Sequence, residues 1–210
     1  MYLCIVTQVV QFLFSSKADF CINYMSLIEL VDNSRTDKQT AHSYLPVYEE
    51  LLQKKKLSAQ SVLEIGIYYG GSIKLWKDYF TNAKVYAVEI FDLRHVWDVL
   101  QHDARIVLYT STDAYDPQFV KTKLVDQGLR FDMILDDGPH SLESMKACIQ
   151  LYLPLLTDDG ILIIEDIQSM DWLDELRNEV PSDLRKYIKT YDLRTVKNRH
   201  DDILFVIDKS

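Results

Sequence analysis

The chain has 210 residues, of which 32 are acidic and 23 basic, and its formal net charge is −9. This length predicts one compact domain, or one domain with a small appendage. The apolar share of 48% is enough for a sizeable core. The acidic surplus argues against a nonspecific nucleic-acid binder and against adhesion to anionic membranes, because both need a basic surface. Three of the six glycines, Gly66, Gly70 and Gly71, lie close together, and this concentration is the first functional signal.

The N-terminal stretch Met1–Phe14 is apolar but contains polar interruptions. It is shorter than the ~20 residues that a membrane-spanning helix needs. It also lacks the basic region and the cleavage site of a signal peptide. We therefore expect residues 1–30 to form an N-terminal appendage and residues 31–210 to form a single domain, with Met25 as an alternative start of the protein.

Cysteine usage bears on the compartment of the protein. Cys4, Cys21 and Cys148 are odd in number, lie far apart and have no metal-binding spacing. A disulfide framework or a zinc ribbon is therefore not expected. The pattern favours a reducing, cytoplasmic location with incidental or buried thiols.

Short β-branched runs alternate with longer segments of helical period from residue 61 onward. The predicted strands are Ser61–Ile65, Val85–Ile90, Arg105–Tyr109, Phe131–Asp136 and Ile161–Glu165. The predicted helices between them are Ser72–Phe80, Asp92–Gln101, Asp116–Gly128 and Ser141–Leu156. This alternation predicts an α/β fold with a parallel sheet covered by helices on both faces. Right-handed crossovers would then place the carboxyl ends of the strands along one edge.

The two ends of this region differ from the alternating part. Lys186–Val196 and Ile203–Ile207 are strand-like and are separated by Lys197–Asp202, which predicts a hairpin that closes the sheet. Before the first strand, Ala41–Leu52 predicts a helix in an N-terminal layer. The basic run Lys54–Lys56 predicts a solvated helix end.

A glycine-containing turn, LEIGIYYGGS, follows the first predicted strand. Glycine at such a turn permits a positive φ and a close approach of the backbone to a ligand. The spacing GxxxGG matches neither the dinucleotide fingerprint GxGxxG nor a phosphate-binding loop. The alternative is an ordinary strand–turn–helix junction. The candidate cofactor-binding residues of this segment are Glu64, Gly66, Tyr68, Gly70, Gly71 and Ser72.

Glu89 ends the second predicted strand, about 20 residues after the glycine turn, where a carboxylate can accept the hydroxyls of an adenosine ribose. Nicotinamide cofactors and S-adenosylmethionine both contain adenosine, so Glu89 does not choose between them. Thr112 and Asp113 follow the third strand. They could meet an adenine edge, and a turn cap is an almost equal alternative.

Acidic residues and a histidine follow the fourth and fifth predicted strands. Asp137, Glu165 and Asp166 would lie side by side at the sheet edge, and three oxygen ligands suit a hard cation such as Mg²⁺. His140 titrates near neutrality and is the available base for a bound hydroxyl. Asp136 precedes this group as a candidate cofactor contact. Helix caps and solvated loop acids are the alternative interpretation.

Together these segments resemble the class I S-adenosylmethionine-dependent methyltransferases and, more narrowly, the macrocin and mycinamicin sugar O-methyltransferases. The resemblance covers roughly residues 32–208, and its most specific motifs are DDGPH and the ED pair. It departs from the family at Pro139, where serine is usual, and at Asp159, where glycine is usual. The segments that carry it are LEIGIYYGGS (63–72), KLWKDYF (74–80), VYAVEI (85–90), FDMILDDGPH (131–140), LPLLTDDGILIIEDI (153–167) and TDKQTAHSYLPVYEELL (36–52).

The resemblance implies a Rossmann-like fold with a seven-stranded, mostly parallel sheet whose last strand is antiparallel. S-adenosylmethionine would lie over the glycine turn with Glu89 on its ribose. Asp137, Glu165 and Asp166 match magnesium ligands, and His140 matches the catalytic base, with Asp137 beside it in catalysis. Lys38, His42 and Tyr44 match a segment that borders the cofactor or the acceptor, without individual roles.

The implied activity is the Mg²⁺-dependent transfer of a methyl group from S-adenosylmethionine to a sugar hydroxyl. The acceptor would be a deoxyhexose such as rhamnose in a glycan or a glycosylated metabolite, with neither nucleic acid nor membrane as partner. Chelation needs only vicinal oxygens, so a catechol-type O-methyltransferase is the alternative. An NAD-dependent oxidoreductase and a non-catalytic cofactor-binding module are more distant alternatives. A homo-oligomer is left open, because this chain is much shorter than the two-domain macrolide enzymes.

Overall fold

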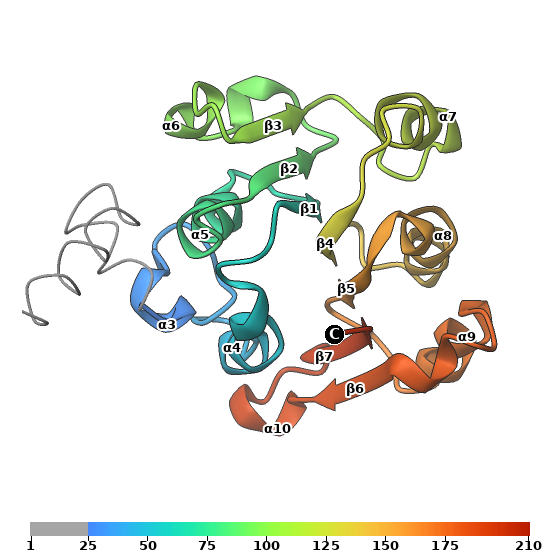
Figure 1. The fold of residues 1–210 in the computed structure, drawn as a ribbon. Helices are drawn as coiled ribbons and strands as arrows, with labels where there is room; N and C mark the ends of the chain where they lie inside the picture. Colours follow the sequence, from blue (N-terminus) through green and yellow to red (C-terminus); the bar gives the residue numbers. More distant parts are fainter. Residues whose placement is uncertain (1–24) are drawn as a thin grey trace, which may run out of the picture.

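The computed structural model describes residues 25–210 (Figure 1). Within this range, seven strands form one sheet in the order β3-β2-β1-β4-β5-β7-β6. Strands β1 to β5 pair in parallel, and β7 runs antiparallel to both β5 and β6. The predicted mostly parallel sheet with an antiparallel last strand is therefore confirmed. The strands are β1 Ser61–Ile65, β2 Lys84–Val88, β3 Ile106–Tyr109, β4 Phe131–Asp136, β5 Leu156–Ile164, β6 Ile188–Asp192 and β7 Ile203–Asp208.

Helices cover both faces of the sheet (Figure 1). Alternation along β1 places Val62 in a core with α3, α4 and α5, and Leu63 in a second core with the helices of the opposite face. The same alternation separates Met133 from Ile134 on β4. The helices are α3 Leu27–Leu30, α4 Leu45–Leu52, α5 Gly71–Tyr79, α6 Asp98–Gln101, α7 Pro117–Phe119, α8 Leu142–Tyr152, α9 Trp172–Glu179 and α10 Arg194–Lys197.

Some element boundaries differ from the sequence expectations. Helix α8 ends at Tyr152, because Pro154 lies in the next turn and has no N–H to continue the helix. Strand β5 begins at Leu156, where it pairs with Phe131, and not at Ile161. The predicted helices 92–101 and 116–128 are irregular. The first is a 3₁₀ turn followed by α6, and the second is α7 followed by a π-helical turn.

The prediction that Lys54–Lys56 is a solvated helix end is wrong for two of its three lysines. Lys54 is exposed, but Lys55 and Lys56 are only 4% and 8% exposed. The Lys55 ammonium lies 2.9 Å from a carboxylate oxygen of Asp159, and Lys56 donates to the carbonyl of Met25. The aliphatic parts of Lys55 and Lys56 are therefore buried, and their ammonium groups are paired with protein oxygens instead of water. Asp159, one of the departures from the family pattern, gains its partner here.

The N-terminal predictions are only partly covered by residues 25–210. Met1–Phe14, Cys4 and Cys21 lie outside the described residues, and the domain boundary at residue 30 stays a prediction. Within the described part, Leu27 of α3 is fully buried in the core of α4 and α5, and Cys148 is a buried free thiol. None of the helices in residues 25–210 has the length and apolar character needed to cross a membrane.

Candidate active site

A cavity of about 1130 Å³ opens where β1, β2, β4 and β5 end, together with the loop after β3. The edge formed by parallel strand ends is the usual ligand-binding place in open α/β sheets. Residues 33–37 with Thr40 and His42, from before β1, complete the wall on another side. Glu64, Gly70 and Asp136 are not among the lining residues. The predicted site residues that line it are Gly66, Tyr68, Gly71, Ser72, Glu89, Thr112, Asp113, Asp137, His140, Glu165 and Asp166.

The glycine turn packs against neighbouring backbone. Gly66 has φ +75°, and an added Cβ there would lie 2.1 Å from the carbonyl oxygen of Asp137. An added Cβ at Gly71 would lie 2.1 Å from the carbonyl oxygen of Arg35. Both distances are far below van der Waals contact, so only glycine lets the turn lie against the loop after β4 and against the segment before β1.

Glu89 holds the glycine turn through its carboxylate. Oε2 accepts hydrogen bonds from the backbone N–H groups of Ile67 at 2.9 Å and Tyr68 at 2.7 Å. Oε1 accepts from the N–H of Phe91 at 3.0 Å. The acid that follows β2 therefore fixes the first loop of the cavity, and it also lines the cavity.

Left-handed backbone recurs in the loops that line the cavity. Tyr68, Ser111, His140 and Asp166 have φ values of 50°, 52°, 53° and 56°. They follow β1, β3, β4 and β5 in turn. Each such residue costs about 1–3 kcal/mol, and such costs concentrate at functional sites. The repeated conformation turns the chain sharply after these four strands, and three of the four residues, Tyr68, His140 and Asp166, line the cavity.

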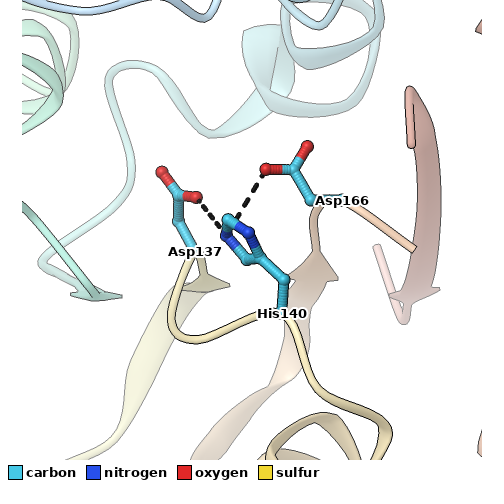
Figure 2. Close-up of side chains that lie close together, drawn as sticks. All are labelled: Asp137, His140 and Asp166. Atoms are coloured by element: carbon cyan, nitrogen blue, oxygen red, sulfur yellow. Dashed lines mark hydrogen bonds and ion pairs between the residues drawn. The ribbon is translucent and has the colours of Figure 1, made fainter. Parts of the chain in front are cut away.

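Asp137, His140 and Asp166 lie close together at the ends of β4 and β5 (Figure 2). Nε2 of His140 is 3.0 Å from Oδ1 of Asp137 and 3.4 Å from Oδ2 of Asp166. Burial alone would lower the pKa of His140. The hydrogen bond to Asp137 and the charge of Asp166 outweigh burial and raise this pKa above its ordinary value. The imidazole is thereby a strong proton acceptor.

Sequence reasoning did not foresee the role of Lys38. Its ammonium is 2.7 Å from Oδ2 of Asp137, 2.6 Å from Oε2 of Glu165 and 3.6 Å from Oε1 of Glu64. Burial works against this charge, but the three carboxylates raise the pKa of Lys38 well above its usual range. Burial also raises the pKa of Asp137, yet the Lys38 ammonium and His140 overcome it and hold this pKa at about 2.

Tyrosine and histidine side chains from the segment before β1 contact the remaining acidic residues near the cavity. Tyr44 donates its hydroxyl to Oδ1 of Asp166, and Tyr48 donates to Oε1 of Glu165. Nδ1 of His42 lies 2.8 Å from Oδ1 of Asp202 and 3.3 Å from Oδ1 of Asp166. Helix-period apolar spacing around residues 41–52 offered no signal for these contacts, because the partners are more than 100 residues away.

The same segment is fastened to the C-terminal hairpin. The Lys197 ammonium, at the end of α10, donates to the backbone carbonyls of Gln39, Thr40 and His42. The pair formed by His42 and Asp202 lies in the same region and is buried. The wall that residues 36–42 contribute to the cavity is therefore held by residues from the last part of the chain.

Two predicted cofactor contacts lie behind the cavity. Oε2 of Glu64 accepts from Nε1 of Trp76 at 2.8 Å, and burial raises the pKa of Glu64 to about 7. Oδ1 of Asp136 accepts from the Tyr115 hydroxyl at 2.5 Å, and burial raises the pKa of Asp136 to about 6. Neither carboxylate lines the cavity, so their direct contact with a cofactor stays a prediction.

The donor set at the strand ends fits a hard divalent cation. One donor atom each from Asp137, His140 and Asp166 lie within 4.8 Å of one another. Carboxylate oxygens suit Mg²⁺, which completes its octahedral shell with water or substrate oxygens. Glu165 lines the same cavity, although its carboxylate oxygens contact Lys38 and Tyr48.

Solved structures of similar shape are methyltransferases or proteins of that fold. A structure described as MycE methyltransferase from the mycinamycin biosynthetic pathway in complex with Mg and SAH matches with a TM-score of 0.66 and 23% identity, covering 88% of this chain and 55% of that chain. A Methanococcus jannaschii fibrillarin matches with a TM-score of 0.53 and 18% identity, covering 73% of this chain and 68% of that chain. The fold is therefore that of the class I methyltransferases.

The family follows from the sequence match. A family model described as a methyltransferase domain matches residues 63–167, half of the chain, and the chain belongs to this methyltransferase domain family. This match begins at Leu63, the first residue of the glycine-turn segment, and ends just beyond Asp166.

Curated relatives act on sugars attached to natural products, according to their names. L-olivosyl-oleandolide 3-O-methyltransferase of Streptomyces antibioticus is 30% identical over 138 residues, which are 62% of this chain and 34% of that protein. 8-Demethyl-8-alpha-L-rhamnosyl tetracenomycin-C 2′-O-methyltransferase of Streptomyces olivaceus is 29% identical over 144 residues, which are 65% of this chain and 36% of that protein. The matched region spans about a third of the length of these curated relatives.

Proposed function

We propose that this protein transfers a methyl group from S-adenosylmethionine to a hydroxyl of a sugar, with Mg²⁺ at the acidic strand ends. One observation carries the proposal: Asp137, His140 and Asp166 converge in the same cavity as the glycine turn and Glu89. The named sugar O-methyltransferases among the relatives support a sugar acceptor. A deoxyhexose in a glycan or glycosylated metabolite is the proposed acceptor class, and a cytoplasmic location remains our expectation.

The cofactor would occupy the part of the cavity formed by the glycine turn, Glu89 and the loop at Thr112 and Asp113. Glu89 would accept the ribose hydroxyls from its position under the turn. S-adenosylmethionine supplies an electrophilic methyl group on a sulfonium. The cavity walls orient the acceptor hydroxyl toward that methyl group, and orientation alone can contribute several orders of magnitude in rate.

His140 would act as the base. Because Nε2 donates its N–H to Asp137, the other ring nitrogen, Nδ1, would take the proton of the acceptor hydroxyl as that oxygen bonds to the methyl carbon and the carbon–sulfur bond breaks. Asp137 and Asp166 would hold Mg²⁺ together with Glu165, and the ion would make a chelated hydroxyl more acidic. Asp137 also orients the imidazole through its hydrogen bond. The product thioether is neutral, so the positive charge leaves with the proton on His140.

Replacing Glu89 with alanine should weaken the binding of S-adenosylhomocysteine about 10- to 100-fold, because hydrogen bonds to a charged group contribute about 1.5–3 kcal/mol. Titration calorimetry with S-adenosylhomocysteine measures this loss. The exposed Glu50 on α4 provides a matched control, and Glu50→Ala should bind as the wild type does. Unchanged affinity in Glu89→Ala would remove this residue from the cofactor site.

An acceptor screen tests the proposed reaction. Glycosylated compounds carrying rhamnose or other deoxyhexoses are incubated with the protein, methyl-labelled S-adenosylmethionine and Mg²⁺, beside catechols as the alternative acceptors. We expect label in the deoxyhexosides and none in the catechols. Label only in catechols would favour the aromatic-diol alternative, for which the exposed Tyr68 and Tyr69 at the cavity rim offer ring surfaces. Cofactor binding without any turnover would contradict the proposed activity and favour a non-catalytic cofactor-binding module.

A further inference from the structure

Lys38 is a charged side chain in the interior of the acidic cluster. It is 2% exposed and is not one of the residues that line the cavity. Its ammonium contacts carboxylates from three strand ends: Glu64 of β1, Asp137 after β4 and Glu165 after β5. Isolated buried charges cost several kcal/mol, so this ammonium and these acids depend on one another.

The Lys38 ammonium contacts only one oxygen of each of these two carboxylates, Asp137 and Glu165. It donates to Oδ2 of Asp137, whose other oxygen, Oδ1, accepts from His140. It takes Oε2 of Glu165, whose other oxygen accepts from Tyr48. Asp166 lies outside this inner group and contacts Tyr44, His42 and His140 instead. One oxygen of Asp137 and one of Glu165 thus face the Lys38 ammonium, while the second oxygen of Asp137 faces His140 and the second oxygen of Glu165 faces the buried Tyr48.

We propose that Lys38 is a positioning residue whose ammonium is the permanent inner cation of the acidic cluster, turning Oδ1 of Asp137 toward His140 and restraining the affinity of the cluster for a divalent ion. The part that concerns the ion rests on the proposed function. The counter-ion role for Glu64, Asp137 and Glu165 does not.

The direction of the effect follows from charge. Without the ammonium, the buried carboxylates of Glu64 and Glu165 lack a cation and the half-buried Asp137 loses one of its two cationic partners, so the folded state loses stability. A divalent ion then meets more uncompensated negative charge and one positive charge fewer, so it binds more tightly. Because an ion that binds only the folded state stabilises it, the stability of the variant becomes dependent on Mg²⁺. The wild type, with its own cation in place, depends on Mg²⁺ far less.

The test compares Lys38→Met with the wild type and with Lys55→Met. Lys55 is a second buried lysine, but it pairs with the exposed Asp159 away from the cluster. In EDTA we expect Lys38→Met to melt about 10 °C or more below the wild type. Saturating Mg²⁺ should recover at least half of that loss, while Lys55→Met should gain no more from Mg²⁺ than the wild type. Titration calorimetry should give Lys38→Met a dissociation constant for Mg²⁺ roughly tenfold lower than that of the wild type.

A second variant keeps the test decisive if Lys38→Met does not fold in EDTA. Lys38→Met with Glu64→Gln removes one acid together with the lysine, and it should melt at a higher temperature than the single variant. A melting temperature of Lys38→Met equal to that of the wild type overturns the counter-ion role. A failure of both variants to respond to Mg²⁺ when the wild type binds it overturns the restraint on the affinity for the ion. Absence of Mg²⁺ binding in the wild type contradicts the metal role in the proposed function instead. The counter-ion role is then decided by the melting temperatures alone.

Discussion

Replacing His140 with alanine is expected to lower the turnover of methyl transfer about 100- to 10,000-fold, the usual contribution of a positioned general base. The hydrogen bond to Asp137 and the nearby charge of Asp166 outweigh burial and raise the pKa of this imidazole, which makes it a stronger base than a free histidine. S-adenosylhomocysteine should bind His140→Ala within a few-fold of the wild type, because the glycine turn and Glu89 are untouched. Steady-state kinetics and calorimetry on the same preparation separate the two effects.

A matched histidine supplies the control. His102 is exposed at the end of α6 and does not line the cavity, so His102→Ala should turn over as the wild type does. Mg²⁺ titration of His140→Ala distinguishes the two chemistries open to this side chain. Unchanged Mg²⁺ affinity identifies a base, whereas a large loss identifies a metal ligand. A turnover number of His140→Ala equal to that of the wild type would remove the residue from both roles.

Replacing Asp137 with asparagine is expected to remove Mg²⁺-dependent turnover and to weaken Mg²⁺ binding by more than tenfold. The substitution keeps the shape of the side chain but removes its negative charge. That charge pairs with Lys38 and His140 and would also bind the ion. Truncating one partner of a buried charged network costs about 3–5 kcal/mol, so the melting temperature should also fall. Cofactor affinity, measured with S-adenosylhomocysteine, should persist.

Asp132 offers a control on the same strand. It lies near the start of β4, where its carboxylate accepts from the backbone N–H groups of Gln60 and Ser61 at the opposite edge of the sheet. Asp132→Asn should therefore leave Mg²⁺ binding and turnover unchanged.

A separate check uses the wild type in excess EDTA. Full activity under that condition would contradict the metal role of the whole acidic cluster.

Local patterns were sufficient to predict five parallel strands, a closing hairpin and the edge at which the parallel strands end. Runs such as Phe131–Asp136 are β-branched or apolar, and each is followed by a polar turn, so strand, strand end and sheet edge could be inferred together. The parallel topology also predicted that Asp137, Glu165 and Asp166 would meet beside His140; the structure groups Asp137, His140 and Asp166, while the carboxylate of Glu165 contacts Lys38 and Tyr48. The exact boundaries did not follow, because Leu156 joins β5 through a tertiary partner, Phe131, that no local pattern encodes.

Long-range electrostatics set the limit of prediction at the site. The resemblance placed Lys38 in a segment that borders the cofactor or the acceptor, but its individual role did not follow, because its partners lie 99 and 127 residues away. The run at Lys55 was misjudged for the same reason, since Asp159 is its distant partner. Glu64 has the residue type expected at a cofactor site, but alternation along β1 turns it toward Trp76 and away from the cavity.

The fastening of residues 36–42 by the C-terminal hairpin has a consequence for folding during synthesis. His42 meets Asp202 across 160 residues of sequence, and Lys197 reaches the carbonyl of His42 across 155. Contacts of such separation carry a large loop-closure cost and form late. A ribosome-bound chain can complete the glycine turn and its β-strand neighbours long before Lys197 and Asp202 have left the exit tunnel. The wall built from residues 36–42 can therefore close only after residues 197–202 have emerged, so the cavity matures later than the strands around the glycine turn.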